Sequence, residues 1–318
     1  MGQPTRNSVH VDALLTNISV AYIQERSKYV ATQVFPIITV DKVSDLYFTY
    51  TKNDWFRDEA QRRADSTESA GSGYNLTTAS YNADVWAFHK DIGDQTRNNA
   101  DNPINLDTEA TEFVTQRLLL RQERKFVSDV FTTGVWGTDR TLSGTDQWSD
   151  FVNSDPRDDV DTAVEAILGV TGFKPNTMVV GWQVWRQLKN HPDFREQIKY
   201  TSADNMTPGM VARMLEIDRF IIASSIYATN VEGATGAYAF NFGKSAWIGY
   251  VNPSPGLLAP SAGYTFAWNG VSGTLGANVG ISSIEMPLKK ATRVEGEIAF
   301  DNKIVATDLG YFISAAVA

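Results

Sequence analysis

The segment RADSTESAGSGYN, residues 63–75, lies between two runs that read as β-strands, SDLYFTYTK (44–52) and ASYNADVWAFHK (79–90). Side chains in both runs alternate with the period of two that is typical of strands rich in β-formers. The insert between them, residues 53–78, is far longer than the about two to five residues of an ordinary hairpin loop. Its Ser/Gly-rich tip, residues 66–73, has little to bury. The sequence therefore predicts a long hairpin whose tip packs against no core of its own.

Aromatic side chains also occur in this insert, in WFRDEAQRRAD (55–65). A two-stranded ribbon is only marginally stable alone in water, so something must cover these rings. Mixed charges beside them are typical of a solvated face, but they also suit a partner of complementary charge. We therefore predict a subunit interface formed by Trp55, Phe56, Arg57, Asp58, Glu59, Arg62 and Arg63.

The longest predicted helix lies in NPINLDTEATEFVTQRLLLRQERKFVSDVFTTG (102–134). Asn105 or Asp107 can cap its start and Gly134 can end it. At ~1.5 Å per residue, a helix over 106–133 spans about 40 Å, more than a small core needs. Basic side chains interrupt its apolar face. We predict that three of them, Arg117, Arg121 and Arg124, contribute to subunit contacts.

The second half of the chain alternates strands and helices. SDPRDDVDTAVEAILGVTG (154–172) begins like a helix, with Asp155 as the N-cap and Pro156 in the first turn. PNTMVVG (175–181) reads as a buried strand, and further strands follow up to residue 317. This order predicts a mixed α+β domain.

Composition limits the classes of function. The 318 residues are 42% hydrophobic, which suffices for packed cores. A formal charge of −9 argues against general affinity for nucleic acid, and the absence of cysteine excludes disulfides and thiolate metal sites. No apolar run is long enough for a membrane span, so no membrane association is predicted.

Motifs for catalysis or cofactor binding are missing. His10, His89 and His191 are not spaced as metal ligands, and neither a nucleophile elbow nor a P-loop occurs. Glu295 and Glu297 would point to the same side of a strand, as a carboxylate-dependent hydrolase requires. With 37 acidic residues, such pairs arise by chance. The prediction is therefore no enzyme and no cofactor, with a hydrolase kept as an alternative.

The order of these parts resembles the major capsid protein of tailed bacteriophages, which has the Hong Kong 97 fold. The most specific string is PNTMVVGWQVWRQLKNHPDFREQIKY (175–200), similar to the start of the axial domain in that family. YNADVWAFHKDIGDQTR (81–97) is the next most familiar. The implied α+β layout is an N-terminal arm (1–34), an extended loop (35–95), a peripheral domain (96–155 and 291–318) with the long spine helix, and an axial domain (156–290).

This resemblance implies a structural protein of the virion that assembles in the bacterial cytoplasm. Hexamers and pentamers would form an icosahedral head around double-stranded DNA, which the acidic protein would contact weakly and without sequence specificity. Scaffolding, portal and decoration proteins are the implied further partners. Some family members cross-link this loop through a lysine, but residues 53–89 contain none.

Other classes stay open at this point. An encapsulin-like compartment would use the same fold to enclose an enzyme. A tail or decoration protein is disfavoured because such chains are usually β-rich and lack a long helix.

Overall fold

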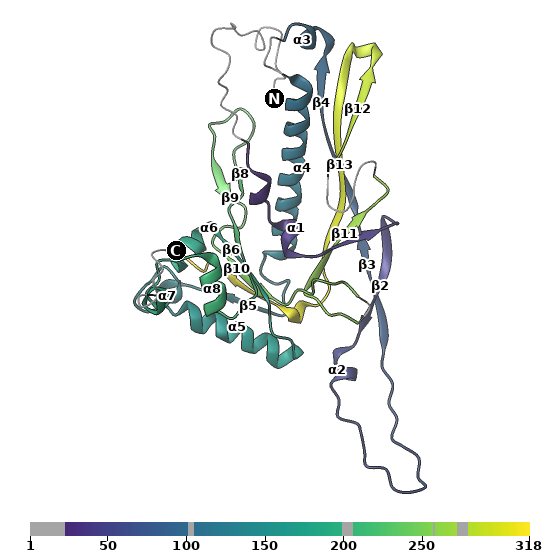
Figure 1. The fold of residues 1–318 in the computed structure, drawn as a ribbon, viewed down its shortest axis with the longest axis vertical. Coiled ribbons are helices and arrows are strands. Elements are labelled where there is room, and N and C mark those ends of the chain that lie inside the picture. Colours follow the sequence, from purple (N-terminus) through teal and green to yellow (C-terminus); the bar gives the residue numbers. More distant parts are fainter. Residues whose placement is uncertain (1–22, 101–104, 199–205, 257, 272–278) are drawn as a thin grey trace.

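The computed structural model describes residues 23–100, 105–198, 206–256, 258–271 and 279–318. In Figure 1 a long helix stands beside one sheet, a second sheet with its helices lies at the lower end, and a loop projects far beyond both. Residues 1–22 of the predicted N-terminal arm lie outside the described residues. None of the described helices combines the length and apolar character needed to cross a membrane.

The first sheet, called here the spine sheet, has five strands in the order β1-β11-β13-β12, with β4 also pairing with β13. The strand β13 is antiparallel to β4, β11 and β12. Its 14 residues make it the axis of the sheet. The bounds are β1 Ile37–Val40, β4 Asp84–Gly93, β11 Gly263–Trp268, β12 Gly280–Met286 and β13 Ala291–Ile304.

The predicted long helix is α4, Leu106–Val130, which packs along the spine sheet. The Asn105 side chain caps it by accepting hydrogen bonds from two backbone N–H groups, as the sequence pattern predicted. Gly296 of β13 lets the helix approach, because a Cβ there would lie 2.5 Å from a methyl carbon of Val114 and 2.8 Å from one of Leu118. Only glycine fits at this crossing without a shift.

The second sheet has the order β5-β14-β10-β6-β7 and contains most of the large core. Its strands are β5 Thr138–Thr141, β6 Thr177–Gly181, β7 Arg219–Ala223, β10 Ala246–Gly249 and β14 Gly310–Ser314. The associated helices are α5 Pro156–Thr171, α6 Trp182–Leu188, α7 Pro192–Ile198 and α8 Pro208–Met214. Helix α5 starts at an Asp155 cap with proline in its first turn, as its sequence predicted. It ends at Gly172, whose φ is +74°.

Smaller elements complete the described chain. They are α1 Ala31–Val34, β2 Ser44–Tyr50, α2 Lys52–Trp55, β3 Leu76–Asn82, α3 Asp94–Asn98, β8 Ile226–Ala228 and β9 Tyr238–Phe240, with 3-10 turns at Arg26–Lys28, Gly144–Asp146, Pro287–Lys289 and Thr307–Leu309. The hairpin β8–β9 forms a separate two-stranded sheet beside α4.

The predicted hairpin exists, but its second strand is shorter than expected. β2 pairs with β3 from Ser44↔Asn82 to Tyr50↔Leu76, and the predicted run 79–90 divides at the buried Ala83. Beyond that residue the chain becomes β4 and joins β13. The alternation of side chains continues across Ala83, so the sequence pattern carried no sign of the change of partner.

The two sheets also divide the chain differently from the predicted segments. β14, placed with 291–318 in the peripheral domain, belongs to the second sheet, between β5 and β10. β11 and β12, placed within 156–290, belong to the spine sheet, as does β4 from the predicted extended loop. Strand periodicity reports which side chains are buried, but it does not report which distant strand provides the partner.

Candidate subunit interface

The β2–β3 ribbon is fixed to the body at its base. The Tyr81 ring stacks on Phe266 of β11 with centroids 4.5 Å apart, and Tyr47 stacks on the same ring at 5.7 Å. Just beyond β2, Lys52 Nζ lies 2.5 Å from an oxygen of Asp308. These contacts set the direction in which the ribbon leaves the body.

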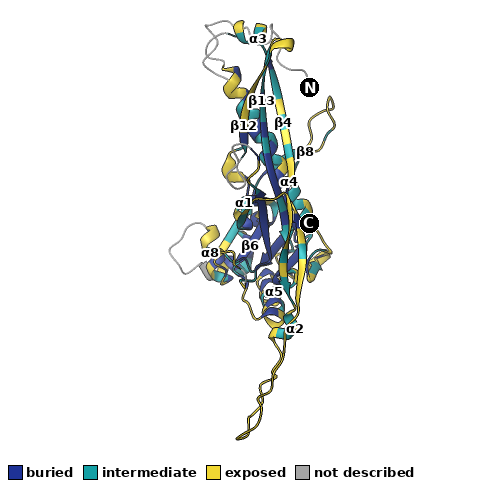
Figure 2. Ribbon diagram, turned by 90° about the vertical axis from the view of Figure 1, so that its right-hand side faces the viewer, coloured by how far each residue is buried: buried dark blue, intermediate teal, exposed yellow. Residues whose placement is uncertain are grey.

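Farther out, the ribbon exposes apolar side chains, and three of its aromatic rings lie close to one another. The rings of Tyr50, Trp55 and Tyr74 lie 5.7 to 6.1 Å apart, yet Trp55 is 54% exposed and Tyr74 62%. Exposed apolar surface of this kind marks interaction sites. The ribbon patch is defined as Leu46, Phe48, Trp55, Phe56, Tyr74 and Leu76, all exposed. Figure 2 shows the exposed ribbon and loop running away from the buried sheets.

The two faces of the first strand follow the predicted alternation. Leu46 and Phe48 point to solvent, whereas Tyr47 packs on the body. Sequence reasoning identified Trp55 and Phe56 but missed Tyr74 and the exposed leucines. For Tyr74 and Leu76, the position beside the Ser/Gly-rich tip was the available signal.

The predicted charged residues of the loop are all exposed. Arg57 pairs with Glu59 at 3.6 Å, and Arg63 Nε donates a hydrogen bond to the Thr67 carbonyl at 2.6 Å. Asp58 and Arg62 are also at the surface. The structure therefore places all five side chains on the projecting loop, where they are exposed.

The three predicted arginines of α4 are each stacked on an aromatic ring of the same chain. The Arg117 guanidinium carbon lies 5.0 Å from the Phe113 ring centroid. Arg121 lies 3.9 Å from Trp86 of β4, and Arg124 lies 3.8 Å from Tyr227 of β8. Stacking of this kind fixes a guanidinium, and in the exposed Arg121 and Arg124 it leaves N–H groups at the ring edge accessible.

A carboxylate that sequence reasoning missed lies on the opposite side of α4. Glu123 is fully buried and accepts hydrogen bonds from the backbone N–H groups of Val30 and Ala31 and from the Ser225 hydroxyl, at 2.8 to 3.1 Å. Burial raises the pKa of Glu123 to about 7, against the lowering effect of these hydrogen bonds. The residue joins the chain before β1, the long helix and the strand region after β7.

One cluster looks like a catalytic triad. Ser154 Oγ lies 3.2 Å from His191 Nε2, and His191 Nδ1 lies 3.1 Å from Asp193 Oδ2. The Ser154 hydroxyl donates to the Asp150 carbonyl at 2.6 Å, and both Ser154 and His191 are buried. The hydroxyl is thus engaged by the backbone and not presented to a substrate, so the cluster fastens the turn before α5 to the start of α7.

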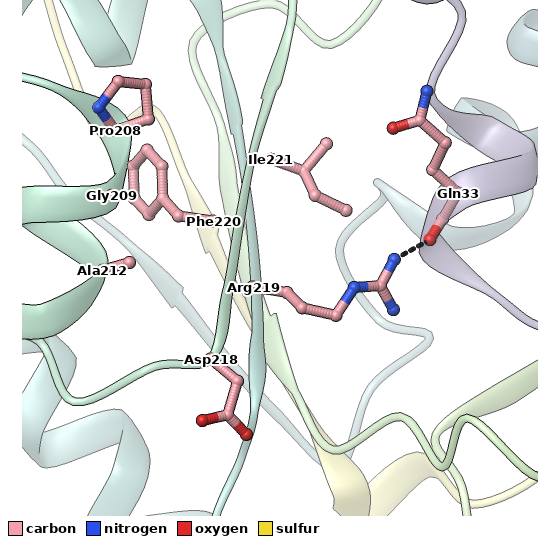
Figure 3. A pocket seen from close by; sticks show the side chains of 8 residues that line it. All are labelled: Gln33, Pro208, Gly209, Ala212, Asp218, Arg219, Phe220 and Ile221. Atoms are coloured by element: carbon pink, nitrogen blue, oxygen red, sulfur yellow. Dashed lines mark hydrogen bonds between the residues drawn. The ribbon is translucent and has the colours of Figure 1, made fainter.

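A cavity of about 350 Å³ lies between α1, α8 and β7. Figure 3 shows the Arg219 guanidinium donating to the Gln33 carbonyl, with Asp218 directed elsewhere. Asp218 and Arg219 are the ionisable residues among its lining. Within the described residues, no group of three or more histidine, aspartate or glutamate side chains is arranged to hold a metal ion. The feature that stands out is therefore the exposed ribbon.

Comparison with known proteins points in the same direction. A family model described as "Phage major capsid protein E" matches residues 134–239. The major capsid protein of Burkholderia phage BcepMu is 24% identical over 312 residues, covering 96% of each chain. The major capsid protein of Pseudomonas phage JBD67 is 26% identical over 319 residues, covering 97% of each chain.

Solved structures share the fold over nearly the whole chain. A phage-related protein from Bordetella bronchiseptica RB50 gives a TM-score of 0.70 at 22% identity, covering 92% of this chain and 94% of its own. The mature capsid of bacteriophage PhiM1 gives a TM-score of 0.60 at 10% identity, covering 96% of this chain and 92% of its own. From these matches and the fold, the chain is similar over nearly its whole length to phage major capsid proteins and shares the Hong Kong 97-like fold.

Proposed function

We propose that this major capsid protein assembles into hexamers and pentamers that close into an icosahedral head around double-stranded DNA. The observation that carries the proposal is the ribbon patch, in which Trp55 is 54% and Phe56 61% exposed. Burial of apolar surface contributes about 25 cal/mol per Å². When a neighbouring copy covers the patch, this burial stabilises the contact, and the same contact is repeated throughout the shell.

The parts of the subunit have separate tasks in this proposal. The spine sheet with α4 is the peripheral domain, and the second sheet with α5 to α8 is the axial domain that gathers around the capsomer axis. The ribbon β2–β3 with residues 51–75 is the extended loop that reaches the next subunit. The N-terminal arm keeps its predicted range, residues 1–34.

The interface residues follow from this arrangement. Trp55 and Phe56 are the apolar anchors, since large aromatic side chains carry most of the binding free energy at interfaces. The flanking charges select the partner surface, namely Arg57, Asp58, Glu59, Arg62 and Arg63. The α4 arginines form a second contact on the subunit.

The remaining partners follow from the task and from the charge. A net charge of −9 keeps contact with packaged DNA weak and independent of sequence, because tight binding needs many cationic contacts with phosphate. Scaffolding, portal and decoration proteins complete the set of partners, and assembly takes place in the bacterial cytoplasm.

Two earlier alternatives lose support. Phage major capsid proteins are structural and not enzymatic, so the hydrolase reading of Glu295 and Glu297 is abandoned. The encapsulin-like reading is disfavoured because both relatives, matched over nearly their whole length, are phage major capsid proteins. A terminase or portal gene beside the coding sequence supports a head, whereas a cargo-enzyme gene there supports a compartment.

The test combines Trp55→Ala with Phe56→Ala. We expect the purified variant to fold with an unchanged unfolding temperature but to lose closed particles in electron micrographs, because both rings lie outside the cores of the subunit. The matched control is Val152→Ala, an apolar side chain that is 88% exposed away from the ribbon. Normal shells from the double variant, or a subunit that unfolds, would contradict the proposed role of the patch.

A further inference from the structure

Three arginines form a row on the outer face of α4. Arg117, Arg121 and Arg124 follow one another at i, i+4 and i+7, which places them on one side of the helix. Figure 1 shows α4 between the hairpin β8–β9 and strand β4, and these elements provide the rings on which Arg124 and Arg121 stack. Arg121 and Arg124 are exposed, and neither forms an ion pair within the part of the chain that the structure describes.

An acidic row of the same length lies on α5. Asp158, Asp161 and Glu165 follow one another at i, i+3 and i+7, and all three are exposed without an ion-pair partner among the described residues. Asp159, one position along, points inward and is neutralised, with one oxygen 2.5 Å from Arg140 and the other accepting from Trp148 Nε1 at 2.7 Å. The acids that face outward are therefore the ones that lack a partner.

The two rows match when the helices run antiparallel. From Arg117 onward the gaps on α4 are four and three residues, and from Glu165 backward the gaps on α5 are also four and three. At ~1.5 Å per residue both rows are about 10 Å long. The pairs are then Arg117 with Glu165, Arg121 with Asp161 and Arg124 with Asp158. A parallel alignment displaces the middle pair by one residue.

Apolar side chains extend the match at one end. Phe113 lies four residues before Arg117 on α4, and Leu168 lies three residues after Glu165 on α5. Phe113 is half-buried under Arg117, and Leu168 is 44% exposed. In the antiparallel alignment these two side chains meet beyond the last ion pair.

One molecule cannot bring its own rows together. α4 stands along the spine sheet, whereas α5 lies across the lower end of the molecule, separated from it in Figure 1. We propose that α5 of one copy docks antiparallel on the arginine row of the next copy in a capsomer. The contact is heterologous, with different surfaces on its two sides, and repeated contacts of this type close into a ring. This inference rests on the proposed shell function and specifies which surfaces meet.

The contact mainly determines the register in which the two helices align. Exposed ion pairs are individually weak, but charge rows guide encounter and disfavour wrong alignments. Because the arginines are held by stacking before binding, less side-chain freedom is lost on docking. The contact should weaken as salt shortens the range of the charges.

Charge reversal tests the pairing in the full-length protein. Arg121→Glu alone and Asp161→Arg alone should each lower the yield of capsomers at least about tenfold at low salt, since like charges then face each other. The chain carrying both changes should restore the yield. Both charges of the pair are then reversed, so opposite charges again face each other in every contact. Glu285→Arg, at an exposed position on β12, is the matched control and should change nothing.

Two measurements distinguish a failure of the proposed helix pairing from a failure of the proposed shell function. Light scattering after size exclusion measures capsomers and tests the pairing, whereas electron microscopy of closed particles tests the shell. Unfolding temperatures identify any variant that fails to fold, and in that case Arg124→Glu with Asp158→Arg replaces the first set. Single reversals that form capsomers normally, or a double reversal that folds but does not recover them, would overturn the pairing even where shells still form.

Discussion

At the scale of single residues, Glu123 is a completely buried residue with an ionisable carboxyl group. Its carboxylate accepts hydrogen bonds from Val30, Ala31 and Ser225, which belong to different segments of the chain. Around it, the neighbouring titratable group is Tyr29, whose pKa is raised to about 12 by burial and by the Glu123 charge. The residue thus links the segment before β1 to the long helix.

The pH dependence of stability follows from this burial. The pKa of Glu123 rises from 4.5 in its ordinary state to about 7 in the folded chain, so the native state binds the proton more tightly than the unfolded state. Its contribution to the free energy of unfolding is therefore full below about pH 4.5 and is lost by about pH 7, by about 3 kcal/mol. Glu123→Gln should remove this slope in chemical denaturation of unassembled subunits between pH 5 and 8. An unchanged slope would contradict the assignment.

Gly296 offers a second test at the residue scale. Gly296→Ala places a methyl group against Val114 and Leu118, and such overpacking should lower the free energy of unfolding by about 1–3 kcal/mol in calorimetry. Gly209→Ala in α8 is the control, because nothing lies within 4 Å of a Cβ there. Equal stability of the two variants would show that the helix and sheet separate easily at this crossing.

At the scale of elements, helices were predictable because their signals are local. The Asn105 cap and the Asp155-Pro156 start each act within one turn, and α4 and α5 begin where these residues indicated. Strand partners were not predictable, because pairing joins distant segments. The division at Ala83 and the placement of β14 in the second sheet are the two clearest cases.

The candidate interface was partly predictable for the same reason. The aromatic and charged residues beside the tip were recognisable, because nothing nearby in the sequence could cover them. The stacking of Arg121 on Trp86 depends on the β4–β13 pairing, and the burial of Glu123 depends on segments about a hundred residues away. Neither leaves a local pattern in the sequence.

Deletion of the tip tests the ribbon as an element. Removing residues 66–73 should leave the unfolding temperature of the subunit unchanged, because these residues are exposed and belong to no strand or helix. Particle yield in electron micrographs should fall, since the loop can no longer follow its neighbour. Replacement of the same residues by a Gly/Ser segment of equal length is the control. A subunit that unfolds after the deletion would show that the tip supports a core.

At the scale of the whole molecule, the buried sheets and the exposed projections have different roles. The cores are complete within one chain, with Trp148, Trp247 and Phe126 fully buried. The ribbon patch and the acidic row on α5 are exposed, and Figure 1 shows the ribbon, α4 and α5 in separate parts of the molecule. The proposed contacts with neighbouring copies would therefore use surfaces that lie outside the cores.

The most direct test of this account is a cryo-electron microscopy map of the assembled particle that resolves side chains. We expect Trp55 and Phe56 of each subunit to be buried against the adjacent subunit. A closed shell in which these two rings still face solvent, or fold back onto their own chain, would contradict it.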